Sequence, residues 1–160
     1  MDILKLVKEK EEKVIKIRHD LHQIPELELE LPKTMEYISK VLDEIGVNYK
    51  KLLNGNAIVV QIDGEQEGKC IAIRADSDAL PVIEETGLSF ASTNGNMHAC
   101  GHDGHTAMAL GACMILNENR NKLKGTVKIF FQPGEETPGG ALPMIEEGCM
   151  ENPKVDAVIG

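Results

Sequence analysis

The sequence contains no tryptophan, and aromatic residues make up 3% of its 160 residues. Its core must therefore be built mainly from aliphatic side chains and methionine. No segment approaches the roughly 18 consecutive apolar residues of a membrane-spanning helix, and the N-terminal residues lack the apolar run of about 7–15 residues that a secretory signal needs. The four cysteines show no close pairing. We therefore expect free thiols, with Cys70 and Cys113 buried, in a cytoplasmic protein.

Basic residues are also few. The sequence has 17 lysines and arginines against 26 aspartates and glutamates, which gives a net charge of −9. This excess of negative charge argues against nucleic acid or an anionic membrane surface as a partner. At 160 residues the chain is long enough to form one domain with a hydrophobic core. We therefore expect a globular domain that binds neither nucleic acid nor membrane.

Hydrophobic periodicity predicts an alternation of helices and strands. Apolar residues at helical spacing are followed by the stop signals Pro25 and Gly46, and two strand-like runs flank the turn pair Asn54-Gly55. Strands that alternate with helices predict an α/β fold, a mostly parallel sheet with flanking helices and an antiparallel hairpin at one side. The predicted helices cover residues 2–24, 32–45, 103–116 and 140–147, and the predicted strands cover residues 47–53, 57–62, 70–74, 126–132 and 155–159.

The most informative segment is residues 98–105 (HACGHDGH), which contains three imidazoles, a thiol and a carboxylate. A hydrophobic core does not explain this density, because each polar group buried without a partner costs about 1–3 kcal/mol. Imidazole and thiolate are usual ligands of first-row metals, and the dipole of the helix that follows should favour the thiolate form of Cys100. The residues alone leave two interpretations open for Cys100 and His102: metal ligands, or a buried thiol beside a capping histidine.

Two pairs of carboxylates follow predicted strands: Asp76 with Asp78, and Glu135 with Glu136. In open α/β sheets, sites form outside the carboxyl ends of the strands, so we expect both pairs to meet the segment 98–105. Adjacent glutamates can point in different directions, so one can bind a metal while the other stays free as a base. For Asp76 and Asp78 two roles remain open, supporting the site and capping local structure.

The remaining polar residues of these segments are expected to have supporting roles. Asp103 is interpreted as the N-cap of the helix that follows, and His105 as a support of the site. His98 is expected to orient the loop rather than to bind metal. His19 and His22 lie one turn apart on the first predicted helix, a spacing that could bind metal, but a structural role is favoured for both.

Four blocks carry a resemblance to a known family: residues 18–26 (RHDLHQIPE), 74–81 (RADSDALP), 97–105 (MHACGHDGH) and 131–136 (FQPGEE). With these blocks in the family's order, the chain resembles the M20 metallopeptidase family, in its aminoacylase-like amidohydrolase branch. Hippurate hydrolases, auxin-conjugate hydrolases and N-acyl-amino-acid amidohydrolases belong to this branch. The resemblance implies a Zn-peptidase-like catalytic domain that hydrolyses N-acyl amino acids.

The resemblance also implies roles for individual residues. Cys100 and His102 match the family's Cys-x-His ligand pair, Glu136 matches the ligating glutamate, and Glu135 matches the general base that works with a metal-activated water. Asp78 is placed with Glu135 among the catalytic residues, as a residue that holds a ligand or its loop. The implied cofactor is a pair of divalent metal ions. Thiolate and imidazole favour zinc, cobalt or nickel over magnesium, and manganese remains open.

The resemblance further implies that residues 1–160 are the N-terminal portion of a catalytic domain. Two further histidine ligands and a dimerising lid domain lie downstream in the family, so we expect a homo-oligomer at full length and an inactive protein from these residues alone. The alternative hypothesis is a non-catalytic metal-binding or oligomerising module derived from such an enzyme.

Overall fold

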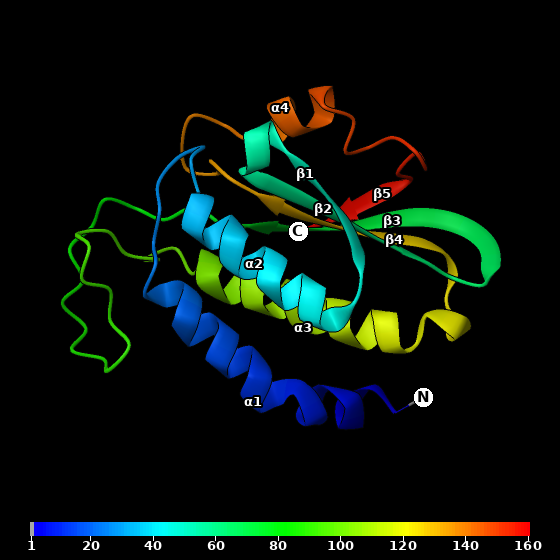
Figure 1. Cartoon of the computed structure of the whole chain (residues 1–160), viewed down its shortest axis with the longest axis horizontal. Coiled ribbons are helices and arrows are strands. Elements are labelled where there is room, and N and C mark those ends of the chain that lie inside the picture. The colour runs from blue at the N-terminus through cyan, green and yellow to red at the C-terminus, as the bar shows by residue number, and fades with distance from the viewer. Residues whose placement is uncertain (1) are drawn as a thin grey trace.

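In the computed structural model, which describes residues 2–160, five strands form one mixed sheet in the order β1-β2-β4-β3-β5 (Figure 1). The α/β class and the predicted hairpin of β1 with β2 are confirmed. β2 also pairs antiparallel with β4, so parallel pairing is confined to β3 and its neighbours β4 and β5. The strands are β1 (Asn48–Leu52), β2 (Ala57–Asp63), β3 (Gln66–Asp76), β4 (Lys124–Gln132) and β5 (Ala157–Ile159).

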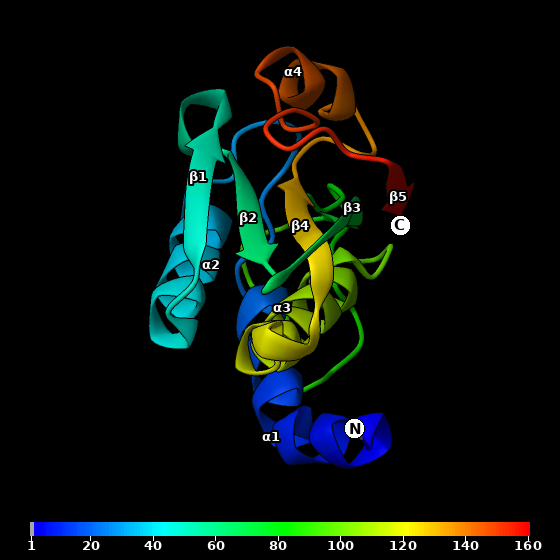
Figure 2. The same cartoon turned by 90° about the vertical axis from the view of Figure 1, so that its right-hand side faces the viewer.

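The helices cover the two faces of this sheet unequally. Figures 1 and 2 show α1, α2 and α3 on one side and the short α4 on the other. Because successive strand residues face opposite sides, Ile58 and Val60 enter the core beneath the three long helices, whereas Val59 joins the smaller cluster that includes Met144 of α4. No helix among residues 2–160 is both long and apolar enough to cross a membrane. The helices are α1 (Ile3–His22), α2 (Pro32–Ile45), α3 (His102–Glu118) and α4 (Ala141–Glu146).

The ends of α2 follow the signals in the sequence. Pro32 is the first helical residue, where its missing N–H costs no hydrogen bond. Gly46 ends the helix with a φ of 73°, and its N–H donates to the carbonyls of Leu42 at 3.0 Å and Asp43 at 3.1 Å. A residue with a side chain would be strained in this left-handed conformation. The predicted start and stop are therefore confirmed.

The chain reaches β3 from β2 by crossing the start of β4, where glycines permit close backbone contact. The N–H of Gly64 donates to the carbonyl of Gly125 at 2.9 Å. A Cβ at Gly125 would lie 2.0 Å from the carbonyl oxygen of Lys69, and the φ of Gly125 is +79°. This crossing places β3 beyond β4, and their parallel register ends with Asp76 opposite Gln132.

Candidate metal centre

The site begins where β3 and β4 end together. The N–H of Ser77 donates to the carbonyl of Gln132 at 2.9 Å, so the segments after the two strands leave the sheet side by side. The first turns of α3 are tied to the same point, because the Thr106 hydroxyl donates to the carbonyl of Asp76 at 2.9 Å. Three segments that are distant in the sequence therefore meet at the carboxyl edge of the sheet, as predicted.

The three predicted ligands lie at this meeting point. Cys100 belongs to the turn before α3, His102 is the first residue of α3, and Glu136 lies in the loop after β4. One potential ligand atom from each residue lies within 4.8 Å of those of the other two. This donor set of sulfur, nitrogen and oxygen is suited to a divalent first-row metal ion.

The ring of His102 is oriented by a backbone carbonyl. Its Nδ1 lies 2.8 Å from the carbonyl oxygen of Asp78, which can only accept, so Nδ1 carries a proton and donates it. In the neutral ring, Nε2 is then left as the unprotonated nitrogen that can bind a metal. The ring is buried, with 2% of its surface exposed, and the hydrogen bond to this carbonyl fixes its tautomer.

Carboxylates gather around the free nitrogen of His102. Nε2 lies 3.7 Å from Asp76 Oδ2, 3.7 Å from Glu135 Oε2 and 3.8 Å from Glu136 Oε1. These separations are too long for hydrogen bonds. Three carboxylates at such distances concentrate negative charge around one nitrogen, which a bound cation would balance. The residues present therefore fit a metal ion.

Asp78 holds both glutamates through their backbones. Its Oδ1 accepts from the N–H of Glu135 at 2.9 Å, and its Oδ2 accepts from the N–H of Glu136 at 3.1 Å. Burial alone would raise the pKa of Asp78, but hydrogen bonds from His102 and from these two N–H groups outweigh burial and lower the pKa. Both oxygens of Asp78 are thus committed, which suits a residue that positions its neighbours rather than one that transfers protons.

A second group of potential metal ligands shares His102 with the first group. Potential ligand atoms of Asp76, His102 and His105 also lie within 4.8 Å of one another. Both oxygens of Asp76 already accept hydrogen bonds at 2.7 Å, one from Arg74 Nη1 and one from His105 Nδ1. Asp76 therefore connects β3 to α3 as well as facing the centre.

The prediction that the dipole of α3 favours the thiolate form of Cys100 is wrong. The pKa of the Cys100 thiol is raised, first by its hydrogen bond to the Glu136 carboxylate and also by the charges of Glu136, Glu135 and Asp76. The negative charge of these carboxylates opposes the partial positive charge of the helix terminus. A metal cation at the same place would have the opposite effect and favour the thiolate.

The predicted N-cap role of Asp103 is also wrong. Gly101 is the N-cap of α3, with a φ of 87°, and no side chain caps this helix. Asp103 lies inside the first turn, where its Oδ2 accepts from His22 Nδ1 at 2.8 Å and from Arg18 Nε at 3.2 Å. Sequence reasoning missed this contact, although Arg18 and His22 are four residues apart and so share one face of α1.

His98 is buried close to these groups but belongs to neither donor set. Its ring is 4% exposed, and neither ring nitrogen has a hydrogen-bond partner among residues 2–160. Burial lowers the pKa of His98 to about 4, so the ring is neutral near pH 7. This placement agrees with a residue of the loop interior rather than a ligand.

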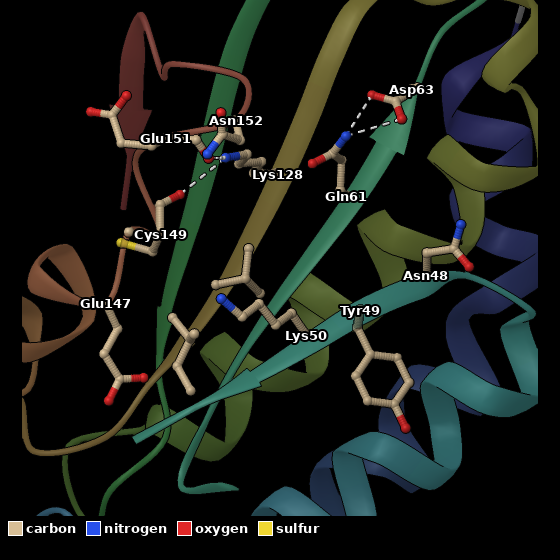
Figure 3. A pocket seen from close by; sticks show the side chains of 13 residues that line it. Asn48, Tyr49, Lys50, Gln61, Asp63, Lys128, Glu147, Cys149, Glu151 and Asn152 are labelled. Carbon is tan, nitrogen blue, oxygen red and sulfur yellow. Dashed lines mark hydrogen bonds between the residues drawn. The ribbon is translucent and has the colours of Figure 1, made fainter. Parts of the chain in front are cut away.

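A hollow of about 450 Å³ lies elsewhere, on the face of the sheet that carries α4 (Figure 3). Figure 3 shows Lys128 of β4 at its wall, and the Lys128 Nζ donates to the carbonyls of Cys149 at 3.2 Å and Glu151 at 2.6 Å. None of the candidate ligands lines this hollow. The chemistry of the chain is therefore concentrated at the edge of the sheet and not in this hollow.

The segment that builds the centre also matches a known family. The sequence profile of peptidase family M20/M25/M40 matches residues 72–160, more than half of the chain and all of the predicted ligands. The chain belongs to this family. Among its relatives, the N-acetyl-L-cysteine deacetylase of Bacillus subtilis is 48% identical over 151 residues, which cover 94% of this chain. The N-acyl-L-amino acid amidohydrolase of Geobacillus stearothermophilus is 42% identical over 161 residues, which cover 99% of this chain.

The fold agrees with this family. The Bacillus subtilis YXEP protein, described as a dinuclear metal binding peptidase from the M20 family, superposes with a TM-score of 0.88 at 42% identity over 94% of this chain. The chain spans 36% and 43% of the length of the two relatives above and 42% of the YXEP chain. These comparisons therefore concern less than half of each relative's length.

Proposed function

We propose that this protein is a metal-dependent amidohydrolase that cleaves the amide bond of N-acyl amino acids. The observation that carries the proposal is the convergence of Cys100, His102 and Glu136 within 4.8 Å, with the carboxylate of Glu135 beside them and outside their group. The substrate class is supported by two relatives, which are named for the removal of acetyl or acyl groups from amino acids.

Cys100, His102 and Glu136 would hold a divalent ion, and the dinuclear YXEP protein supports a pair of ions completed by donors from elsewhere in the whole protein. Zinc, cobalt, nickel and manganese are the candidates for this donor set. Ions bound there would supply Lewis acidity and lower the pKa of a nearby water from about 15.7 toward about 7.

Glu135 is proposed as the general base. Its side chain is 40% exposed, so substrate and water can reach it, and its backbone is fixed by Asp78. The Glu135 carboxylate would take a proton as the water oxygen bonds to the amide carbon. It would then deliver that proton to the nitrogen as the C–N bond breaks, leaving a carboxylate and a free amino acid. Proton transfer of this kind contributes about 10²–10⁴-fold to the rate.

Two adjacent glutamates offer a matched test of metal binding. Glu136→Gln is expected to weaken binding of Co²⁺ because it removes a ligand, whereas Glu135→Gln should leave Co²⁺ binding intact. Titration with Co²⁺, followed by the absorption bands of the bound ion, measures both. Equal Co²⁺ affinity in the wild type and in Glu136→Gln would refute the ligand assignment.

Turnover is best assayed in a chimera, in which residues 1–160 replace the matching segment of the Bacillus subtilis N-acetyl-L-cysteine deacetylase. We expect this chimera to hydrolyse N-acetyl-cysteine and its Glu135→Gln variant to bind metal but lose about 10²-fold or more in kcat. Full activity of that variant would place the base elsewhere. Metal binding without turnover in a folded chimera would favour the alternative, a non-catalytic metal-binding module.

A further inference from the structure

His22, at the end of α1, is a buried junction of three segments. Its ring is 2% exposed, and each of its nitrogens faces a carboxylate: Nδ1 lies 2.8 Å from Asp103 Oδ2, and Nε2 lies 3.1 Å from Glu84 Oε1. The ring of Phe90 packs edge-on against it, with the centroids 5.5 Å apart. These contacts join α1 to the start of α3 and to the long loop between β3 and α3.

Asp103 depends on α1 for its hydrogen bonds. Its side chain is buried, and its Oδ2 accepts from His22 and from Arg18, whereas its Oδ1 has no partner among the described residues. A buried carboxylate that loses its cationic or hydrogen-bonding partner is strongly destabilised, so the first turn of α3 would shift to expose it. Removal of His22 therefore acts directly on the position of Asp103.

Asp103 directly follows the candidate ligand His102 in the first turn of α3, so a shift of one backbone moves the other. Gly101 and Gly104 flank the pair, and a Cβ at either glycine would meet no atom within 4 Å, so side-chain packing at these two positions does not hold the turn. The ring of His102 is held by the carbonyl of Asp78, and the backbone next to it is held through the contact of Asp103 with His22. These two contacts together fix where Nε2 points.

We propose that His22 is a positioning residue of the metal centre, which acts through Asp103 to hold His102 and Cys100 in ligating geometry. This inference rests on the proposed function, because it concerns the same centre. It assigns a role to α1, which contributes no ligand, and it makes the metal affinity of the site depend on a hydrogen bond behind it. Partners behind metal ligands commonly change metal affinity by about 10–100-fold when they are removed.

The test compares His22→Phe with the matched control His19→Phe, titrating each protein with Co²⁺ alone. Both substitutions replace a histidine of α1 with an apolar ring. His19 stacks on Phe90, with centroids 3.7 Å apart, a contact that phenylalanine can keep. We expect His22→Phe to bind Co²⁺ about tenfold more weakly, with a changed thiolate-to-cobalt absorption band, and His19→Phe to match the wild type. A role confined to folding would change the Tm but not the cobalt spectrum.

The outcomes separate the two proposals. Wild-type affinity and spectrum in His22→Phe would overturn the role of His22 while leaving the metal centre intact. A wild type that binds no Co²⁺ would overturn both, starting with the proposed function. If circular dichroism shows that His22→Phe does not fold, Asp103→Asn decides the matter, because it keeps the size of the side chain and removes the charge that His22 contacts. Weaker Co²⁺ binding by folded Asp103→Asn supports the anchor, and unchanged binding refutes it.

Discussion

The four thiols of this chain have different surroundings, and Cys100 is the exposed one. Burial raises the pKa of Cys113 to about 12, and Cys70 and Cys149 are buried as well. Only a thiolate reacts readily with an alkylating reagent, so iodoacetamide should modify Cys100 first. Glu136 raises the pKa of Cys100, so Glu136→Gln should increase the thiolate fraction at pH 8 and speed this reaction.

Intact mass and peptide mapping over time measure this prediction in metal-free protein. We expect one fast modification per chain, its loss in Cys100→Ser, and a rate in Glu136→Gln that exceeds the wild-type rate. Rapid labelling of a buried cysteine, or an unchanged rate in Glu136→Gln, would contradict the described surroundings of Cys100.

At the scale of elements, the sequence predicted those features that have a local cause. Helix α2 begins and ends at its proline and glycine signals, and the carboxylates after β3 and β4 meet because parallel strands share an edge. The contact of His22 with Asp103 joins residues 81 positions apart, and nothing in local spacing encodes it. The raised pKa of Cys100 was missed for the same reason, because it depends on Glu136 from another segment.

The long loop before α3 should give the protein a specific sensitivity to acid. The pKa of Glu84 is lowered from 4.5 to about 2, first by the Thr86 hydroxyl against an opposing effect of burial, then by the Ser92 N–H and by His22. A lowered pKa means that ionised Glu84 stabilises the fold above pH 4.5 and that this stabilisation is lost as the pH falls from 4.5 toward 2.

Glu84→Gln should therefore lower the free energy of unfolding at pH 7 and reduce its dependence on pH below 4.5. Urea denaturation at pH 7, 4.5 and 3.5 measures the difference. Glu85→Gln, a change at the neighbouring exposed residue, is the control. If the free energy of unfolding changes with pH in the same way in the wild type and in Glu84→Gln, ionised Glu84 does not stabilise the fold.

The crossing between β2 and β3 makes a sharper demand on one residue. In Gly125→Ala, the new Cβ would lie 2.0 Å from the Lys69 carbonyl oxygen, at a φ of +79°. Gly87→Ala is the matched control, since its φ is +70° and its Cβ would meet nothing within 4 Å. We expect Gly87→Ala to lower the free energy of unfolding by about 1 kcal/mol, because its backbone is left-handed. Gly125→Ala should lower it clearly more, and urea denaturation measures both changes. Equal decreases in the two variants would show that β3 and β4 can move apart at the crossing at little cost in free energy.

For the molecule as a whole, the metal centre lies where the sheet, α3 and the loop after β4 meet. Cys100, His102 and Glu136 come from two segments that unfolding would separate, so an ion that they share binds the folded state and not the unfolded chain. Ligand at 100 times its Kd stabilises a fold by about 2.7 kcal/mol. For a chain of this size that corresponds to a rise in Tm of about 5–10 °C.

We therefore expect Zn²⁺ or Co²⁺ to raise the Tm, and EDTA to reverse the rise, in calorimetry of the protein at fixed pH. Glu135→Gln should keep the rise, because Glu135 lies outside the donor group, whereas Glu136→Gln should lose most of it. The two variants remove the same charge from adjacent positions, so a general electrostatic effect of the cation would affect them equally. Different shifts for the two variants would locate binding at the donor atoms, and equal shifts would show that the ion binds the acidic surface without a defined centre.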